Sequence, residues 1–123
     1  MKKRTEKNLY QSRVVERPVR KSVRLPASLI TREGVYQGYI INISASGVGM
    51  FIDTHVQEST IGCSQGSILT VEFTFGSGEL IALWCRICWL RIISNADNGI
   101  TTSMGMEVID PPPGFVNMYH SLL

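Results

Sequence analysis

The 123-residue sequence predicts an all-β fold, an antiparallel barrel or compact sandwich of about six strands. Several stretches alternate apolar and polar residues, which is the pattern of a strand with one buried face. Short segments rich in Gly, Ser and Asn separate these stretches and favour turns. Only the C-terminal residues are expected to form a helix. Many short strands with little helix are typical of barrels and sandwiches.

The first three strands are expected near the start of the β-rich part of the chain. Residues 24–31, RLPASLIT, form a plausible first strand, which Pro26 restricts to a sheet edge or a strand start. Residues 34–44, GVYQGYIINIS, alternate aromatic or aliphatic residues with polar ones, and GVGMFID at 47–53 resumes the pattern after a polar turn. A Gly/Ser-rich loop is expected at 56–67.

The second half of the chain supplies three more strands and the helix. ILTVEFTF at 68–75 alternates regularly and precedes GSGE, a hairpin signal with two glycines. A long strand rich in β-branched and aromatic residues follows at 80–93, and the last strand is expected at 103–110 after a polar loop. The prolines at 111–113 end the sheet, and residues 115–123 are expected to form a short helix.

Positive charge is concentrated at the start of the chain. Residues 1–24 hold nine Lys and Arg against two Glu, a net charge of +7, whereas the remaining 99 residues carry −5. We therefore expect a flexible basic arm at residues 1–16 and one barrel domain at 17–123. Such an arm requires an anionic partner, which would be a nucleotide, nucleic acid, an anionic membrane or the acidic body of the chain itself.

The composition favours a cytoplasmic protein that does not insert into membranes. The basic N-terminal segment lacks the apolar stretch of a secretory leader. The most apolar segment, at 80–93, is too short and too charged to span a bilayer. Three cysteines, an odd count, argue against a disulfide framework and for a reducing compartment.

Two short motifs have the chemistry of a ligand site. Arg20 and Arg24 lie four residues apart, and a guanidinium binds phosphate or the O6/N7 edge of guanine and stacks on purine rings. In NISASG, the amide of Asn42 can read a base edge, the hydroxyl of Ser44 can cap a turn or bind phosphate, and Gly47 suits positive φ or close approach of a ligand. Taken singly, each motif also fits solvated surface charge or an ordinary polar turn.

In this order, RxxxR followed by NxSxxG, the motifs resemble those of the PilZ domain family. The resemblance extends over residues 17–110 and implies a six-stranded antiparallel β-barrel whose ligand is the bacterial second messenger cyclic di-GMP. It assigns ligand contacts to Arg20, Arg24, Asn42, Ser44 and Gly47, and Arg17 is a further candidate outside the motif. Val19, just before the first arginine, occupies a position that influences whether one nucleotide or a stacked pair binds. The number of nucleotides stays open.

Other patterns do not indicate catalysis or a metal. Cys85 and Cys88 in CRIC point to opposite faces of a strand, so we expect core packing beside Trp84 and Trp89. GCSQG at 62–66 matches the G-x-S-x-G sequence pattern of a hydrolase nucleophile elbow. That elbow requires a strand-to-helix turn on a parallel sheet, whereas these residues are expected in a loop between antiparallel strands.

His55 and His120 are isolated, and no paired carboxylates or metal-ligand cluster accompany them. We therefore expect neither an enzyme, nor a cofactor, nor a bound metal.

The resemblance implies a receptor that changes conformation when cyclic di-GMP binds and signals to an effector protein of unknown identity. Motility, exopolysaccharide production and biofilm formation are the processes it suggests. One alternative is a PilZ-type protein–protein adaptor that binds no nucleotide, for example in type IV pilus assembly. Nucleic-acid binding through the basic arm is less favoured, because we expect no aromatic platform and no second basic patch on the body.

Overall fold

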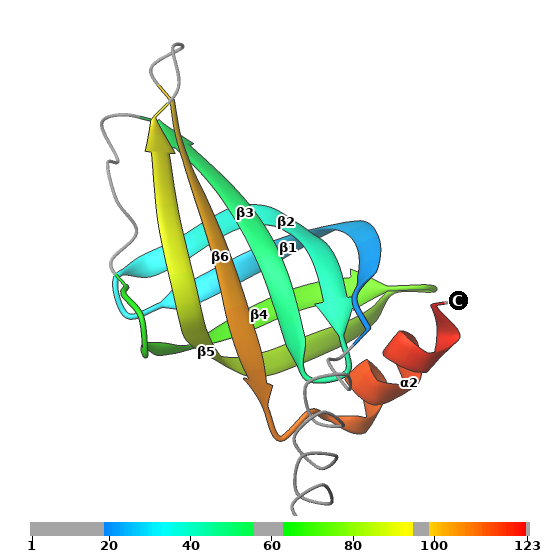
Figure 1. The fold of residues 1–123 in the computed structure, drawn as a ribbon. Coiled ribbons are helices and arrows are strands. Elements are labelled where there is room, and N and C mark those ends of the chain that lie inside the picture. The colour runs from blue at the N-terminus through cyan, green and yellow to red at the C-terminus, as the bar shows by residue number, and fades with distance from the viewer. Residues whose placement is uncertain (1–18, 56–62, 95–98, 123) are drawn as a thin grey trace, which may run out of the picture.

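The computed structural model describes residues 19–55, 63–94 and 99–122, which form a closed barrel of six antiparallel strands (Figure 1). The strands are β1 (Lys21–Thr31), β2 (Gly34–Ser44), β3 (Gly47–His55), β4 (Ile68–Phe75), β5 (Glu79–Ser94) and β6 (Gly99–Ile109). Around the barrel they follow the order β1-β2-β3-β6-β5-β4, and β1 pairs with β4 to close it. The predicted fold class is confirmed, whereas the arm expected at 1–16 lies outside the described residues.

The alternation that predicted the strands places their apolar residues inside the barrel. On β4, Leu69, Val71 and Phe73 are buried and the residues between them are not. On β5, buried and exposed residues alternate from Ile81 to Ile87. Since side chains in a strand point alternately to the two faces, the inward set fills the interior of the barrel as its core.

Two strands begin earlier than the sequence predicts. β1 starts at Lys21 rather than at 24, so Arg24 lies within the strand and Arg20 just before it. β6 starts at Gly99 rather than at 103, because residues 99–102, expected to be a loop, pair with residues 52–55 of β3. Pairing with a neighbouring strand overrides the turn propensity of these polar residues.

The hairpin predicted between β4 and β5 is confirmed. Its turn contains Gly76 with φ of 64° and Gly78 with φ of 104°. Residues with a Cβ rarely adopt these left-handed conformations, so glycine is favoured at both positions.

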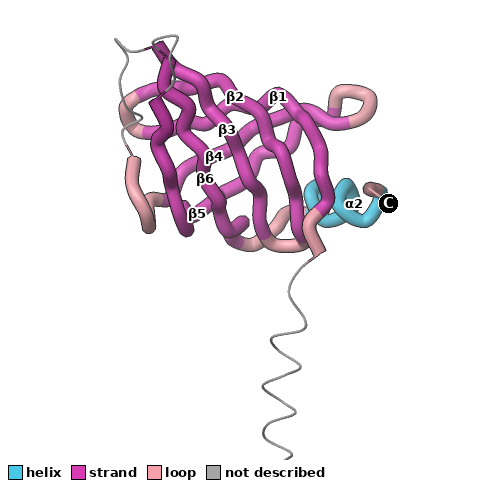
Figure 2. The backbone as a smooth tube through the Cα atoms, turned by 45° about the horizontal axis from the view of Figure 1, so that its top comes forward, coloured by secondary structure: helices cyan, strands magenta, loops and turns pink. Residues whose placement is uncertain are grey.

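The helix α2 (Pro113–Ser121) lies against one end of the barrel (Figure 2). Its proline at the first helical position loses no intrahelical hydrogen bond there. Phe115 is fully buried and Met118 nearly so, and both join the barrel core. Burial of an aromatic side chain of this size stabilises the fold by roughly 1.5–3 kcal/mol.

Among the described residues, the structure contains no helix of the length and apolarity that crossing a bilayer requires.

Candidate functional site

A row of paired residues crosses five strands on the outer face of the barrel. Ser22 of β1 pairs with Asn42 of β2, which pairs with Gly49 of β3. Gly49 pairs with Gly105 of β6, and Gly105 pairs with Trp89 of β5. Directly paired residues in antiparallel strands present their side chains on the same face. The row therefore brings together residues that are far apart in the sequence.

Bulges in two strands turn Asn42 and Trp89 outward. On β2, Tyr36, Gly38 and Ile40 face inward, and unbroken alternation would put Asn42 inside the barrel as well. The register shifts between Ile40 and Asn42, so Asn42 faces outward and Ile43 is buried. An extra residue in one strand re-aims the side chains that follow it, and bulges are common beside functional sites.

A bulge on β5 likewise turns Trp89 outward, contrary to the expectation that CRIC packs in the core beside Trp84 and Trp89. The register shifts between Ile87 and Trp89, and Trp89 is 47% exposed. Trp84 is exposed because it lies between inward-facing Leu83 and Cys85. Of the two cysteines, Cys85 is buried in the core as expected, but Cys88 occupies the bulge and is exposed.

Two glycines form the floor between Asn42 and Trp89. A Cβ at Gly49 would lie 2.9 Å from both the nitrogen and the oxygen of the Asn42 amide. A Cβ at Gly105 would lie 2.5 Å from Cε2 and 2.9 Å from Cδ1 of the Trp89 indole. All these distances are shorter than ordinary contacts, so the side chains of Asn42 and Trp89 lie over the glycines only because glycine lacks a side chain. An isolated glycine within a strand was the sequence signal for this close approach.

Arg20 contacts the row and is held in place by α2. Its Nη1 donates a hydrogen bond of 2.8 Å to Oδ1 of Asn42. On one side, the carbonyl oxygen of Val19 accepts a 2.9 Å hydrogen bond from the hydroxyl of Tyr119. On the other, the Lys21 ammonium donates to the carbonyl oxygen of Tyr119 at 3.0 Å and lies 4.2 Å from the centre of its ring. The backbone of Val19 and the side chain of Lys21, on either side of Arg20, are therefore both bonded to Tyr119 of the helix.

Arg24 lies on an exposed aromatic surface next to the row. Its guanidinium carbon is 4.2 Å from the centre of the Tyr39 ring, a distance typical of a cation–π contact. Tyr39 pairs with Phe51, and both are partly exposed. Phe51 pairs with Ser103, which pairs with Arg91, so a second cation borders this surface from β5. The expectation that the body lacks an aromatic platform is therefore wrong.

The row encloses a pocket of about 180 Å³. Its lining residues are Arg20, Ile41, Asn42, Gly49, Trp89, Ser103, Met104 and Gly105. Small-molecule pockets usually measure roughly 300–1,000 Å³, so this one has room for only part of a ligand of that size. A second hollow, of about 450 Å³, lies where Lys21 and Ser22 face the end of α2.

Ser44 and Gly47 lie at the end of the β2–β3 hairpin and do not line the pocket. Ser44 is buried, and its hydroxyl donates a long hydrogen bond of 3.5 Å to the carbonyl oxygen of Gly47. Gly47 is not among the residues with positive φ. A Cβ there would lie 2.9 Å from the carbonyl oxygen of Met106, so glycine allows the hairpin to approach β6 closely. Arg17 lies outside the described residues.

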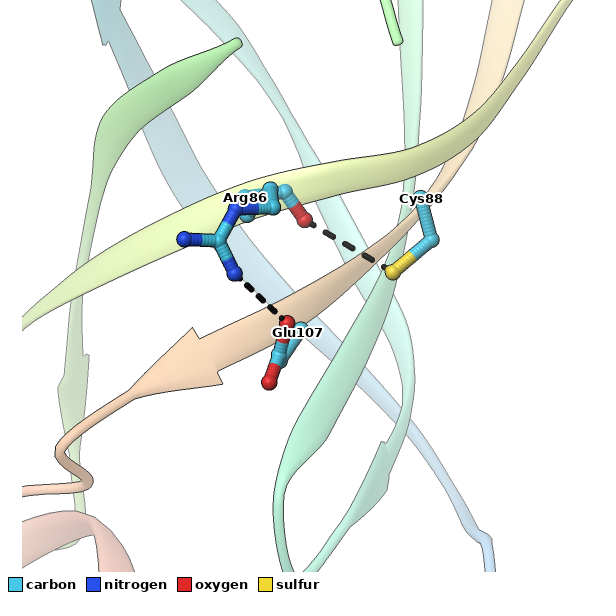
Figure 3. A network of polar contacts seen from close by, with 3 residues as sticks. All are labelled: Arg86, Cys88 and Glu107. Carbon is cyan, nitrogen blue, oxygen red and sulfur yellow. Dashed lines mark hydrogen bonds and ion pairs between the residues drawn. The ribbon is translucent and has the colours of Figure 1, made fainter. Parts of the chain in front are cut away.

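An ion pair borders the site on its β5 side (Figure 3). Nη1 of Arg86 lies 3.0 Å from Oε1 of Glu107, and the thiol of Cys88 donates to the carbonyl oxygen of Arg86 at 3.8 Å. Both charged side chains are about half exposed, so the pair contributes at most about 1 kcal/mol. It does, however, occupy the guanidinium of Arg86.

Among the described residues, no group of three His, Cys, Asp or Glu side chains is arranged to hold a metal ion.

Comparison with solved structures shows the same fold in other proteins. The PilZ domain of YcgR from Escherichia coli, solved with c-di-GMP, is 13% identical, with a TM-score of 0.66 over 87% of this chain and 90% of that one. The inhibitor of motility MotI/DgrA from Bacillus subtilis is 15% identical, with a TM-score of 0.60 over 86% of this chain and 47% of that one.

PlzA of Borreliella burgdorferi, solved in complex with c-di-GMP, is 10% identical, with a TM-score of 0.60 over 94% of this chain and 52% of that one. The chain thus spans about half the length of MotI and PlzA. A comparison with curated protein sequences gives no match. The family model for the PilZ domain matches residues 13–114, which is most of the sequence and includes all six strands of the barrel. The chain belongs to the PilZ domain family.

Proposed function

We propose that this protein is a receptor for cyclic di-GMP that passes the signal to an effector protein. The observation that carries the proposal is the contact of Arg20 with Asn42 beside the indole of Trp89, above a floor of two glycines. A guanidinium and an amide supply donors and an acceptor for the edge of a guanine. An exposed indole supplies a face on which a base stacks. Two of the structurally similar PilZ proteins were solved with c-di-GMP.

In this proposal the ligand lies across the outer face of the barrel. One guanine enters the pocket between Arg20 and Trp89, and the phosphates lie towards Arg24, whose guanidinium is exposed above Tyr39. Ser44 and Gly47 act by holding the hairpin that carries Asn42. Arg17 is a further candidate phosphate ligand.

Coupling to an effector requires a change that reaches beyond the pocket. Residues on both sides of Arg20 are bonded to Tyr119 of α2. A ligand that draws Arg20 towards itself therefore acts on the attachment of this helix. We propose that the altered surface is read by an effector protein, and the similarity to MotI, an inhibitor of motility, makes motility the first process to examine.

Titration calorimetry with cyclic di-GMP, cyclic di-AMP, GTP and a short single-stranded oligonucleotide tests the ligand and its stoichiometry. We expect saturable binding of cyclic di-GMP alone. Arg24→Ala removes charge-assisted contacts that contribute about 2–3 kcal/mol, so the affinity of the variant for cyclic di-GMP should fall roughly 30- to 150-fold. Arg32→Ala is the matched control, because Arg32 is an exposed arginine in the turn at the far end of β1.

Unchanged affinity in Arg24→Ala would contradict the assignment of the site. Preferential binding of the oligonucleotide, with a steep dependence on salt, would favour nucleic acid as the ligand of the Arg24 surface instead.

A further inference from the structure

A second exposed surface lies on β5, away from the pocket. Leu80, Ala82 and Trp84 alternate with buried residues and form an outward stripe along the strand. Leu80 is 62% exposed and Trp84 is 65% exposed. A tryptophan with this much exposed area, in line with another large apolar side chain, is typical of an interaction site rather than of scattered surface residues.

Trp84 borders an open groove built from three strands. In the sheet, Trp84 pairs with Thr70 of β4 and with Ile109 of β6. The groove measures about 290 Å³, and its lining includes these three residues, Ala82 and Asp110. Asp110 has φ of 48°, a left-handed conformation that aspartate tolerates better than most residues. This bend ends β6 and places the residue at the edge of the groove.

The charge around the stripe is negative. Glu72 of β4 pairs with Ala82, and Asp110 lies beside Trp84. Glu79 precedes the stripe, at the start of β5. The nearest arginine along the strand, Arg86, is engaged with Glu107 (Figure 3). In the part of the chain that the structure describes, the stripe is thus bordered by carboxylates, and phosphate-bearing partners are disfavoured there.

We propose that the β5 stripe and its groove are a docking surface for a protein segment that carries an arginine or lysine next to an apolar side chain. The cation lies over the face of Trp84 and pairs with Asp110, and the apolar side chain packs on Leu80 and Ala82. Indole is the aromatic ring that binds cations best, and a nearby carboxylate adds to the attraction. Buried aromatic anchors with an adjacent charge are typical of interface hot spots.

This surface does not depend on nucleotide binding. Its residues are distinct from those of the pocket, and the Arg86–Glu107 pair lies between the two on β5. The inference therefore goes beyond the proposed function and stands even if cyclic di-GMP fails to bind.

Photo-crosslinking of the full chain in the organism that produces it tests the proposal. The probe is benzoylphenylalanine placed at Ala82, in the centre of the stripe, with the same probe at Val35 of β2 as the control for an exposed apolar position. We expect a product specific to position 82 whose cross-linked peptide, identified by mass spectrometry, contains Arg or Lys beside an apolar residue. With the probe at position 82, Trp84→Ala should lower the yield about tenfold. Asp110→Asn, which preserves the left-handed bend, should lower it about threefold.

Calorimetry with cyclic di-GMP on Trp84→Ala separates this inference from the proposed function, since nucleotide affinity should be unchanged. Because Trp84 is exposed, the variant should also keep its thermal midpoint. The proposal is overturned by cross-links to acidic or uncharged segments, by cross-links only to residues 1–18 of the chain itself, or by a yield no higher than at Val35.

Discussion

Replacing Gly105 by alanine tests whether Trp89 forms a wall of the ligand pocket. The new Cβ would lie 2.5 Å from Cε2 of the indole, whereas carbon atoms in contact are about 3.5–4.0 Å apart. The ring must therefore retreat by at least about 1 Å. Trp89 is 47% exposed, so it can rotate into solvent without distorting the sheet. We expect the free energy of unfolding to change by less than about 1 kcal/mol.

The affinity for cyclic di-GMP should respond much more strongly. Stacking of a base on an aromatic side chain contributes about 1–3 kcal/mol, so loss of the wall should weaken binding roughly 5- to 150-fold. Calorimetry measures the affinity. Indole fluorescence in a Trp84→Phe background reports the position of Trp89, because the sequence contains only these two tryptophans.

Gly38→Ala is the matched control for the rearrangement. A Cβ at Gly38 would overlap the carbonyl oxygen of Phe51 and lie 2.8 Å from Cγ1 of Ile52. Backbone atoms cannot rotate away, so this variant should lose about 1–3 kcal/mol of stability. Its folded fraction should bind ligand normally. If Gly105→Ala leaves both the emission of Trp89 and the affinity unchanged, the ring does not form the wall of the pocket and the reasoning fails.

Two further predictions concern stability. Burial raises the pKa of the Cys85 thiol from 9.0 to about 12. The folded state therefore keeps a proton that the unfolded state releases, so stability that is fully present below pH 9 is lost as the pH rises towards 12. Urea unfolding across this range should show that the free energy of unfolding falls more steeply with pH than it does in Cys85→Ala. Equal slopes in the two proteins would refute the prediction. Tyr119→Phe removes the hydroxyl bonded to the carbonyl oxygen of Val19, so urea unfolding should show a loss of about 1 kcal/mol of stability. A variant as stable as the parent would show that this bond does not hold α2 to the residues before β1.

Local patterns in the sequence were sufficient for most of the fold. Alternation of apolar and polar residues predicted the strands, because a half-buried strand requires a period of two. GSGE predicted the β4–β5 hairpin, because its glycines adopt left-handed conformations. The errors at the starts of β1 and β6 arose where pairing with another strand extends a segment of weak local preference.

The candidate site was predicted in part. The spacing of the two motifs singled out Arg20 and Asn42, which form a hydrogen bond in the structure. The prediction placed Trp89 in the core, because it assumed strict alternation along β5. The extra residue at Cys88 breaks this alternation and turns Trp89 outward. The register of β5 against β6 decides which side of the barrel the ring faces.

Residues close together in the chain dictate which segments become strands, where they turn and which polar side chains are available to a ligand, so these features can be predicted from the sequence alone. That Asn42 and Trp89 face outward over a floor formed by Gly49 and Gly105 is a property of the folded barrel. Bulges and register are set jointly by strands that meet only when the barrel closes, so no local pattern predicts them.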